Sequence, residues 1–458
     1  MSNSVEITNK LATDKIGKLI WSYSLPSIVG TVVMALYNVV DRIFIGQGVG
    51  ALAISGIALT FPFMILLMAF GMLVGVGAAS RISITLGENK REKAEKILSN
   101  ALILTFIISG SVIVLSYIFL SDLLRLFGGT QQTVQYAEEY MRIIIPGGIL
   151  SALNFGFNNI MRASGYPTKA MYTMVVCAVL NIILDPIFIY VFHWGIAGAA
   201  IATNISYFVG TIWVLSHFLL KNSIIKFRRK NFKLEKDIIK SILSIGMSPF
   251  SMQLATSLIF LLMNTTLIHY GGDLAIGAFG IINSINTLII MIIIGLNQGT
   301  QPIIGYNYGA GLHDRMFKTL KYSVVIATAM STFGFVLGTF FPNFMSAMFT
   351  QNVELQTIST QALRISVLMF PVVGSQIVIS NFFQSIGKAN ISIFLSLTRQ
   401  IIFLVPCLLI LPPIYGLSGA WAAMPMSDGF SAIVSYLTIY FFVRRFRSKL
   451  NLGNSNTP

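Results

Sequence analysis

The 458-residue chain is 55% hydrophobic and only 10% charged, whereas soluble domains carry about 25% charged residues to cover their surface. This composition excludes an ordinary soluble domain and predicts an all-α integral membrane protein. The net charge of +15 does not predict nucleic-acid binding, because the basic residues cluster in short segments between apolar runs.

Twelve candidate spans follow one another along the chain, each long enough for a bilayer core, which requires roughly 20 apolar residues. They are residues 19–46, 54–82, 97–120, 137–161, 168–192, 196–219, 240–269, 275–305, 318–341, 357–385, 390–412 and 416–443. No small-residue cleavage site accompanies the first of them, so we expect a retained span rather than a signal peptide. The sequence therefore predicts twelve transmembrane helices.

The basic residues lie almost entirely on one side of these spans. With twelve crossings, both termini and every even-numbered loop share a side, and that side holds Lys10, Lys15, Lys18, Lys90, Arg91, Lys93, Lys96, the run from Lys221 to Lys240, Arg315, Lys318, Lys321, Arg444, Arg445, Arg447 and Lys449. The opposite side holds Arg42, Arg125, Arg142 and Arg364. Because positive loops remain in the cytoplasm, we expect a multi-pass protein of the bacterial inner (cytoplasmic) membrane with both termini cytoplasmic.

An internal repeat relates the second half of the chain to the first at a nearly constant offset. Pro26 aligns with Pro249 and Asp41 with Asn264, and four glycine pairs follow: Gly71-x3-Gly75 with Gly295-x3-Gly299, Gly87 with Gly311, Gly165 with Gly387, and Gly195 through Gly198 with Gly416 through Gly419. Each half has six spans, so the halves are parallel and related by a pseudo-two-fold axis along the membrane normal. We predict an N-lobe at 1–220, a basic cytoplasmic linker at 221–237 and a C-lobe at 238–458.

Three acids fall well inside the spans: Asp41, Asp185 and Asp428. An acid in a membrane costs several kcal/mol and usually marks a functional site. Asp41 and Asp185 lie within about one helical turn of the same depth, since a helix rises about 1.5 Å per residue. The structural alternatives are that Asp41 pairs with Arg42 and that Asp185 caps a kink. Asp428 is either a substrate counter-charge or a contact within the bundle.

The neighbours of the two outer acids suit ion binding. Tyr37 and Asn38 share a helix face with Asp41, and Asn181 shares one with Asp185. Pro186 disfavours helical geometry at Asp185 and frees nearby carbonyls, and Thr203 in the sixth span lies at comparable depth. Arg399 in the eleventh span is a candidate partner for Asp428, or it extends toward the cytoplasm.

Further polar residues lie inside the spans and are commonly contacts between helices. With Tyr37, Asn38 and Asp428, the candidates for lining a substrate cavity are Asn158, Gln253, Asn264 and Asn283. The four histidines are scattered, no catalytic residues are predicted, and a Walker A motif is missing from the sequence. Transport without a cofactor, driven by an ion gradient, is therefore expected rather than enzymatic catalysis.

Several motifs resemble one family. The run from Leu25-Pro26 through Tyr37-Asn38-Val39-Val40-Asp41-Arg42 to Gly46 is similar to the first span of multidrug and toxic compound extrusion (MATE) transporters. The segments Arg162-Ala-Ser-Gly-Tyr-Pro-Thr-Lys169, Asn181-x3-Asp185-Pro186 and Gly195-Ile-Ala-Gly198-Ala-Ala-Ile-Ala-Thr203 resemble its fourth, fifth and sixth spans. The likeness covers essentially the whole chain and is strongest to the MepA-like bacterial branch.

The resemblance implies two six-helix lobes and export of cationic or amphipathic compounds in exchange for H⁺ or Na⁺. The family's amino-lobe cation site carries over onto Asp41, Asn181, Asp185 and Thr203, which are also the expected ligands if the ion is Na⁺, and onto Asn154. Pro26 matches a proline at which the helix bends in some members. Some members also have acids in the seventh, eighth or tenth span, whereas Asn264 stands at such a position in this chain.

The resulting hypothesis is multidrug efflux by antiport with alternating access, in which H⁺ or Na⁺ at Asp41 and Asp185 displaces a cationic substrate. The expected partners are small organic cations and membrane lipids, and the expected oligomeric state is a monomer. The alternative in the related superfamily is a lipid-linked saccharide flippase, which needs basic residues in its cavity. A channel or a purely structural membrane protein would not require a repeat with buried acids.

Overall fold

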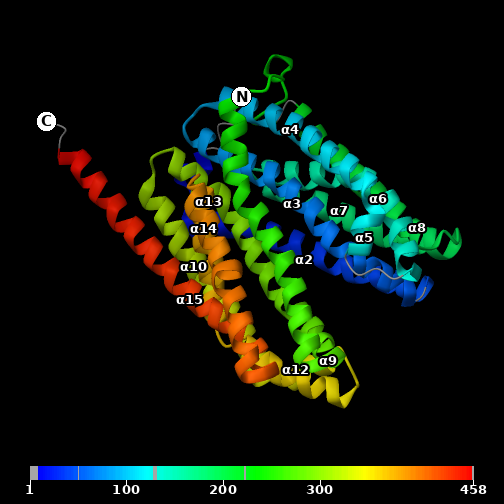
Figure 1. Ribbon diagram of the computed structural model, residues 1–458. Coiled ribbons are helices and arrows are strands. Elements are labelled where there is room, and N and C mark those ends of the chain that lie inside the picture. The colour runs from blue at the N-terminus through cyan, green and yellow to red at the C-terminus, as the bar shows by residue number, and fades with distance from the viewer. Residues whose placement is uncertain (1–8, 50, 127–130, 221–222, 456–458) are drawn as a thin grey trace. The chain divides into compact units, whose positions relative to one another are not determined.

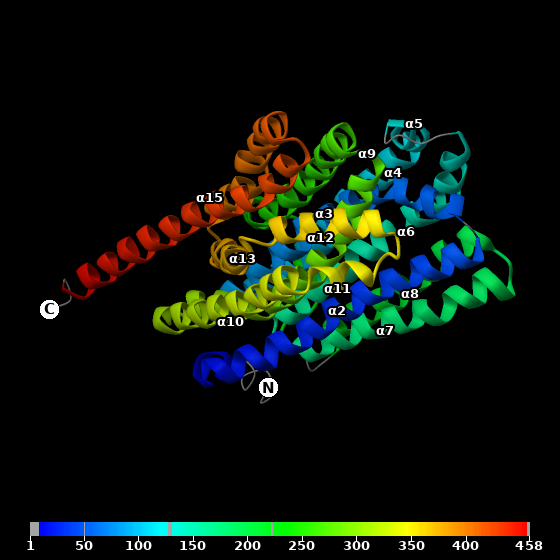
Figure 2. The same ribbon diagram turned by 90° about the horizontal axis from the view of Figure 1, so that it is seen from below.

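The computed structural model describes residues 9–49, 51–126, 131–220 and 223–455, and every regular element within these ranges is helical (Figures 1 and 2). Side chains of some helical residues, including Asn38 and Arg42, lie outside the described part. The elements are α2 (Ile16–Gly48), α3 (Ala51–Gly87), α4 (Arg91–Ile118), α5 (Leu120–Leu126), α6 (Gln131–Ala163), α7 (Pro167–Pro186), η1 (Ile187–Val191), α8 (Gly195–Leu219), η2 (Arg229–Asn231), α9 (Lys236–Gly309), α10 (His313–Phe340), α11 (Pro342–Ala347), α12 (Val353–Ser366), α13 (Phe370–Ser385), α14 (Ala389–Leu397), η3 (Thr398–Leu404) and α15 (Val405–Ser455).

Nine helices in the described ranges are long and apolar enough to cross a membrane, and α12 with α13 forms a tenth candidate bent by 57°. Two of the nine contain two spans each. The 74 residues of α9 would extend roughly 110 Å at 1.5 Å per residue, over three times a bilayer core of about 30 Å. This run is interrupted at Gly272 (φ 65°, ψ −163°), and α15 is interrupted at Gly416 (φ 59°, ψ −139°). Counting each side of these two breaks separately, and α12 with α13 as one bent span, gives twelve spans in the described ranges, as predicted.

The chain forms two compact units. The first comprises Met1–Ser257, Ile294–Thr319 and Gln384–Asn390, and the second comprises Leu258–Ile293, Leu320–Phe383 and Ile391–Pro458. These units differ from the predicted lobes, because both ends of α9 and one later loop pack with the first half of the chain. The lobes were defined by the repeat rather than by compactness, and their boundaries stay a prediction.

Backbone conformation reproduces the repeat. Gly165 and Gly387 both have positive φ (99° and 74°), as do Gly195 and Gly416 (55° and 59°). A third such pair, Asn89 (φ 60°) and Gly311 (φ 72°), was not predicted. This pair shows that Gly311 is equivalent to Asn89. The predicted alignment of Gly87 with Gly311 was therefore wrong by two residues. Asparagine tolerates the left-handed region, which explains why residue identity concealed this equivalence.

In the first unit, α2 packs along α7, while α6 contacts both α3 and α8 (Figure 1). A hydrophobic core joins the outer ends of these helices, with Ile45, Phe63, Met141 and Ile145 nearly inaccessible to solvent. Because the interior of this unit is largely apolar, buried polar side chains within it are candidates for a functional site.

The C-terminal ends of α3 and α9 form a close seam within the first unit. A Cβ atom on Gly87 would lie 2.1 Å from the carbonyl oxygen of Tyr306, and one on Gly309 would lie 2.0 Å from that of Ile84. Gly309 follows Gly87 in the sequence by the same interval as Tyr306 follows Ile84. The two contacts are therefore equivalent, which is what a pseudo-two-fold axis through the seam requires. Glycine at both positions permits the backbones to touch.

The linker between the halves is fastened to the first turns of α4. Arg228 Nε donates to Glu95 Oε2 at 2.5 Å, Lys96 pairs with Glu235 at 2.8 Å, and Lys230 pairs with Glu92. Asn100 adds two bonds, donating to the Lys233 carbonyl and accepting from the Glu235 amide. Basic side chains of the linker thus pair with Glu92 and Glu95 in the first turns of α4, where the helix dipole favours acidic residues.

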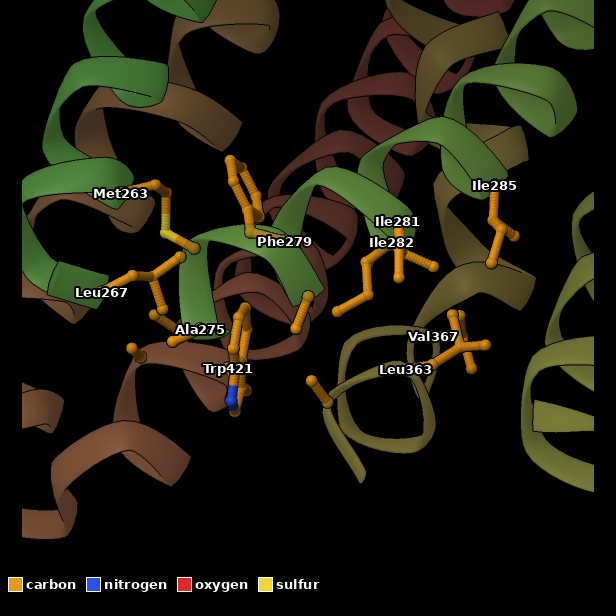
Figure 3. Packing of buried hydrophobic residues seen from close by; sticks show 14 of the residues in the cluster. Met263, Leu267, Ala275, Phe279, Ile281, Ile282, Ile285, Leu363, Val367 and Trp421 are labelled. Carbon is orange, nitrogen blue, oxygen red and sulfur yellow. The ribbon is translucent and has the colours of Figure 1, made fainter. Parts of the chain in front are cut away.

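The second unit has its own hydrophobic core, built from α9, α12 and α15. Figure 3 shows Trp421 of α15 pointing toward the α9 residues near Ala275, while Leu363 and Val367 lie nearer to Ile285 of α9. Trp421 is 3% exposed and Ala275 is fully buried. This core packs parts of α9, α12 and α15 together within the second unit.

Candidate ion-coupling site

A buried polar stripe runs along α7. Thr173, Cys177, Asn181 and Asp185 recur at intervals of four residues and are all buried, whereas Val179 and Ile183 are about half exposed. An interval of four places side chains one above another on the same face of a helix. The polar face of α7 is therefore buried against neighbouring helices, and its branched apolar residues lie on the exposed face.

Asp185 occupies the outer end of this stripe and is fully buried. Asn181 Nδ2 donates to Asp185 Oδ1 at 3.2 Å and to Thr203 Oγ1 of α8 at 3.3 Å. Within the described residues, Asp185 Oδ2 and Asn181 Oδ1 accept no hydrogen bond from an amide or an alcohol group. Buried acceptors without such donors are uncommon and call for an explanation. These two oxygens suit a proton or a small cation.

Asp41 of α2 faces this group. The carboxyl group of Asp41 is close enough to that of Asp185 for the two to interact electrostatically. Two carboxyl groups at close range repel each other when both are ionised, and a proton or a cation between them relieves that repulsion. Tyr190 donates to the Phe44 carbonyl at 3.1 Å, which fixes the outer end of α2 against η1.

The structure therefore brings together Asp41, Asn181, Asp185 and Thr203, and their role in binding the coupling ion stays a prediction. Asn154 lies one helical turn inward, where its Nδ2 donates to Cys177 Sγ at 3.4 Å. Asn154 thus contacts the polar stripe of α7 from α6, and it does not bond to either acid in the described hydrogen bonds. Its predicted role in coupling stays a prediction.

The sequence identified only one member of a tyrosine pair. The hydroxyl groups of Tyr37 and Tyr207 lie 3.3 Å apart, and Tyr37 is 7% exposed. Tyr37 was a candidate, but Tyr207 was not. The available signal was its position four residues after Thr203, which places both side chains on one face of α8.

The expectation that Pro186 disrupts the helix at Asp185 was wrong. α7 continues through Pro186, whose φ of −63° and ψ of −31° are helical. The irregularity follows immediately as the π-helix η1 (Ile187–Val191). Proline's fixed φ fits a helix, and a single π turn accommodates the missing donor nearby. Pro26 likewise lies inside the continuous α2, and bending there stays a prediction.

The remaining substrate-cavity candidates are dispersed. Asn158 donates to the Ala170 carbonyl at 2.8 Å, a contact between α6 and α7. Gln253 is half-buried in the first unit, Asn283 is half-buried in the second, and Asn264 is exposed. The side chain of Asn38 lies outside the described part. A role for these residues in a substrate cavity stays a prediction.

Asp428 and Arg399 form an ion pair in the second unit, as proposed from the sequence. Arg399 Nε donates to Asp428 Oδ1 at 2.7 Å, and the Asp428 side chain is 6% exposed. Ser427 Oγ donates to the Arg399 carbonyl within the π-helix η3. The charge of this acid is thus balanced by Arg399.

The known proteins give this geometry a context. The model of the MatE family matches residues 26–187 and 250–409. The chain belongs to the MatE family of transporters. The two matched stretches are nearly equal in length, so the family's unit occurs twice, and the offset between them agrees with the repeat found in the sequence.

Curated and solved MatE relatives match nearly the whole chain. The multidrug export protein MepA of Staphylococcus aureus (strain NCTC 8325 / PS 47) is 28% identical over 444 residues, 96% of either chain. The MATE multidrug transporter DinF-BH, whose structure was solved as a complex with a small molecule, is 38% identical, with a TM-score of 0.88, over 93% of this chain and 96% of that one. A MOP superfamily transporter from Pyrococcus furiosus Vc1 (DSM3638), whose reverse polarity of the binding pocket suggests a different function, is 27% identical, with a TM-score of 0.91, over 96% and 98%. The predicted all-helical membrane fold is confirmed.

Proposed function

We propose that this transporter exports cationic or amphipathic compounds in exchange for H⁺ or Na⁺. The observation that carries the proposal is the proximity of the half-buried Asp41 to the fully buried Asp185. Two carboxylates in an apolar setting repel each other and are stabilised by one positive charge. The same pair therefore attracts either the coupling ion or, through its charge, a cationic substrate.

Competition for this pair supplies the coupling. When an ion enters from outside, it neutralises the site and weakens the hold on a cationic substrate. When the transporter turns inward, the ion leaves toward the cytoplasm and the site regains its negative charge. Linkage requires that ion and substrate each lower the affinity for the other by the same factor.

The relatives support export of drug-like molecules. MepA is a multidrug export protein, and DinF-BH is a multidrug transporter solved with a small molecule bound. The close seam between α3 and α9 lies at the predicted cytoplasmic ends of these helices, which suits a state closed to the cytoplasm. Alternating access would then separate this seam.

The decisive variant is Asp185→Asn, which keeps the shape of the side chain but cannot exchange a proton. We expect it to abolish ethidium efflux from cells that lack other pumps, with unchanged amounts of protein in the membrane. Asp273→Asn is the matched control, because Asp273 is exposed, and it should export like wild type. Wild-type efflux by the Asp185 variant would refute the proposal.

The coupling ion follows from a second experiment. Proteoliposomes are given either a pH gradient or a Na⁺ gradient, and ethidium movement is recorded with each. Proton coupling predicts a response to the pH gradient that a protonophore removes. Sodium coupling predicts a response to the Na⁺ gradient, with Asn181 and Thr203 oxygens completing the coordination.

The alternative of a lipid-linked saccharide flippase requires basic residues to hold a pyrophosphate. The basic candidate from the sequence, Arg399, is engaged by Asp428. The Pyrococcus furiosus transporter has a similar fold, with a pocket of reverse polarity that suggests a different function. The acids of this site favour a cationic substrate over a pyrophosphate-linked one.

A further inference from the structure

A cavity of about 320 Å³ lies at the inner end of the first unit, apart from the ion-coupling site. Its lining residues are Arg81, Ile84, Glu88, Ser241, Ser244, Ile245, Tyr308, Ile386, Gly387 and Lys388. This volume is at the lower end of the range for small-molecule sites, about 300–1,000 Å³. All of the residues that line the cavity belong to the first compact unit.

The walls come from four places that are distant in sequence. α3 contributes one face, both ends of α9 contribute two more, and the loop at Gly387 and Lys388 contributes the last. Each place lies at an even-numbered loop or at the helix end beside it. The cavity therefore faces the side that the basic residues predict to be cytoplasmic.

The cavity contains two cationic side chains without counter-ions. Within the described part of the chain, neither Arg81 nor Lys388 forms an ion pair or a side-chain hydrogen bond. Glu88 also lines the cavity, but Lys90 holds its carboxylate at 3.0 Å. The local balance of these four groups is thus positive. Such a balance favours an anion over a cation or a neutral solute.

Hydroxyl groups supplement the charges. Ser241 and Ser244 lie three residues apart on α9 and face the same cavity, and Tyr308 lies near the other end of that helix. A guanidinium, an ammonium and several hydroxyls together match the acceptor oxygens of a phosphate group. Basic pockets between membrane helices on the cytoplasmic side commonly bind the headgroups of acidic lipids.

We propose that this cavity binds an anionic phosphate group, held by Arg81 and Lys388 and by the surrounding hydroxyls. The phosphate is either that of an acidic phospholipid headgroup in the inner leaflet or that of a soluble phosphate compound. The ligand bridges the first half of the chain, through Arg81, and the second half, through Lys388.

This bridging has a conformational consequence, which rests on the proposed function. The cavity borders the seam at which Gly87 meets Tyr306 and Gly309 meets Ile84. Separating the seam would also separate Arg81 from Lys388 and dismantle the site. A bound phosphate group therefore stabilises the state that is closed to the cytoplasm, since a ligand favours the state to which it binds better.

Binding is tested by thermal unfolding of the purified full-length protein in a neutral detergent. The probes are dihexanoyl phosphatidylglycerol, dihexanoyl phosphatidylcholine, inorganic phosphate, and sodium chloride at matched ionic strength. We expect a saturable rise in the unfolding midpoint with phosphatidylglycerol and none with phosphatidylcholine or chloride. Saturation with inorganic phosphate as well identifies phosphate itself as sufficient, whereas saturation with phosphatidylglycerol alone identifies the lipid headgroup.

The variants Arg81→Gln and Lys388→Gln should each weaken this binding by about tenfold, because each loses a charge-assisted contact. Lys388 is exposed in a loop, so its variant tests the site even if the Arg81 variant fails to fold. Lys93→Gln is the matched control, since Lys93 is an exposed basic residue of α4 outside the cavity. Equal midpoint shifts in wild type, the Lys388 variant and the control would overturn the proposal, as would no saturable shift with either phosphate probe.

The outcome is separable from that of the proposed function. Loss of the phosphate response in the Lys388 variant supports the site even if ethidium is not exported. Conversely, ethidium export that depends on Asp185, with no saturable phosphate response, refutes the site and leaves antiport standing. In liposomes, phosphatidylglycerol should slow export by wild type more than by the Lys388 variant.

Discussion

The seam between α3 and α9 gives a direct test of alternating access, through the substitution Gly309→Ala. In the structure, a Cβ atom at this position would lie 2.0 Å from the carbonyl oxygen of Ile84. A carbon and a carbonyl oxygen in favourable contact are about 3.3–3.6 Å apart, so the helices would have to separate locally by over ~1 Å. The added methyl group is therefore incompatible with the closed seam, whereas an open seam has room for it.

The size of the effect follows from this clash. Inserting a methyl group into a packed contact costs about 1–3 kcal/mol. If the open state lacks the clash, the equilibrium shifts toward opening by about 5- to 150-fold. Gly87→Ala should act in the same direction, because its Cβ atom would lie 2.1 Å from the Tyr306 carbonyl oxygen.

Cysteine labelling measures the shift. Ser83 is 1% exposed and lies next to Gly305 in the seam, so a Ser83→Cys reporter becomes reactive when the seam opens. In inside-out vesicles, a membrane-impermeant maleimide should label the reporter faster when Gly309→Ala is present. The protein without the reporter gives the background from the native cysteines.

Gly110→Ala is the matched control, because beyond the local backbone of its own helix no described atom lies within 4 Å of the position a Cβ would take there. It adds the same methyl group to a membrane helix without a clash. Equal labelling rates for the Gly309 and Gly110 variants would show that the seam does not control access from the predicted cytoplasmic side.

Two stability predictions concern the charges outside the ion-coupling site. Glu95→Gln should lower the free energy of unfolding by about 1–2 kcal/mol, because the Glu95 side chain is 3% exposed while its partner Arg228 is half exposed. Glu92→Gln, at an exposed pair, should cost less than Glu95→Gln in the same equilibrium denaturation, and equal losses would contradict the different burial of the two pairs. Arg399→Gln should cost about 3–5 kcal/mol by leaving Asp428 buried without its partner, whereas Arg399→Met with Asp428→Leu should lie within about 1 kcal/mol of wild type. A single variant as stable as the double one would show that the pair is not buried as described.

The spans were predictable because their signal is local. A helix that crosses a bilayer must be apolar over its own length, whatever its neighbours are. The predicted spans 240–269 and 275–305 meet around the break at Gly272, and 390–412 and 416–443 meet around the break at Gly416. Helix ends beyond the membrane, such as the start of α9 at Lys236, were less accurate because polar residues extend a helix without a hydropathy signal.

The ion-coupling site was predictable to the extent that it follows helix periodicity and depth. Asn181 and Asp185 share a face of α7, and the depth of Thr203 matched theirs. The bond between Tyr37 and Tyr207 depends instead on how α2 and α8 are rotated about their own axes. That rotation is set by packing with other helices, and no local pattern in either segment determines it.

The seam shows most clearly what a sequence repeat conveys and what it conceals. Alignment by residue type joined Gly87 to Gly311, because both are glycines near a basic residue. The backbone instead joins Gly311 to Asn89, by their shared positive φ, and Gly87 to Gly309, by their equivalent contacts. A two-fold axis preserves both backbone conformation and contact distance. Glycine and asparagine can both adopt the positive φ, whereas only a residue without a Cβ allows the close backbone contact. Asn89 could therefore diverge from glycine, whereas Gly87 and Gly309 are held to the same residue by the seam they close.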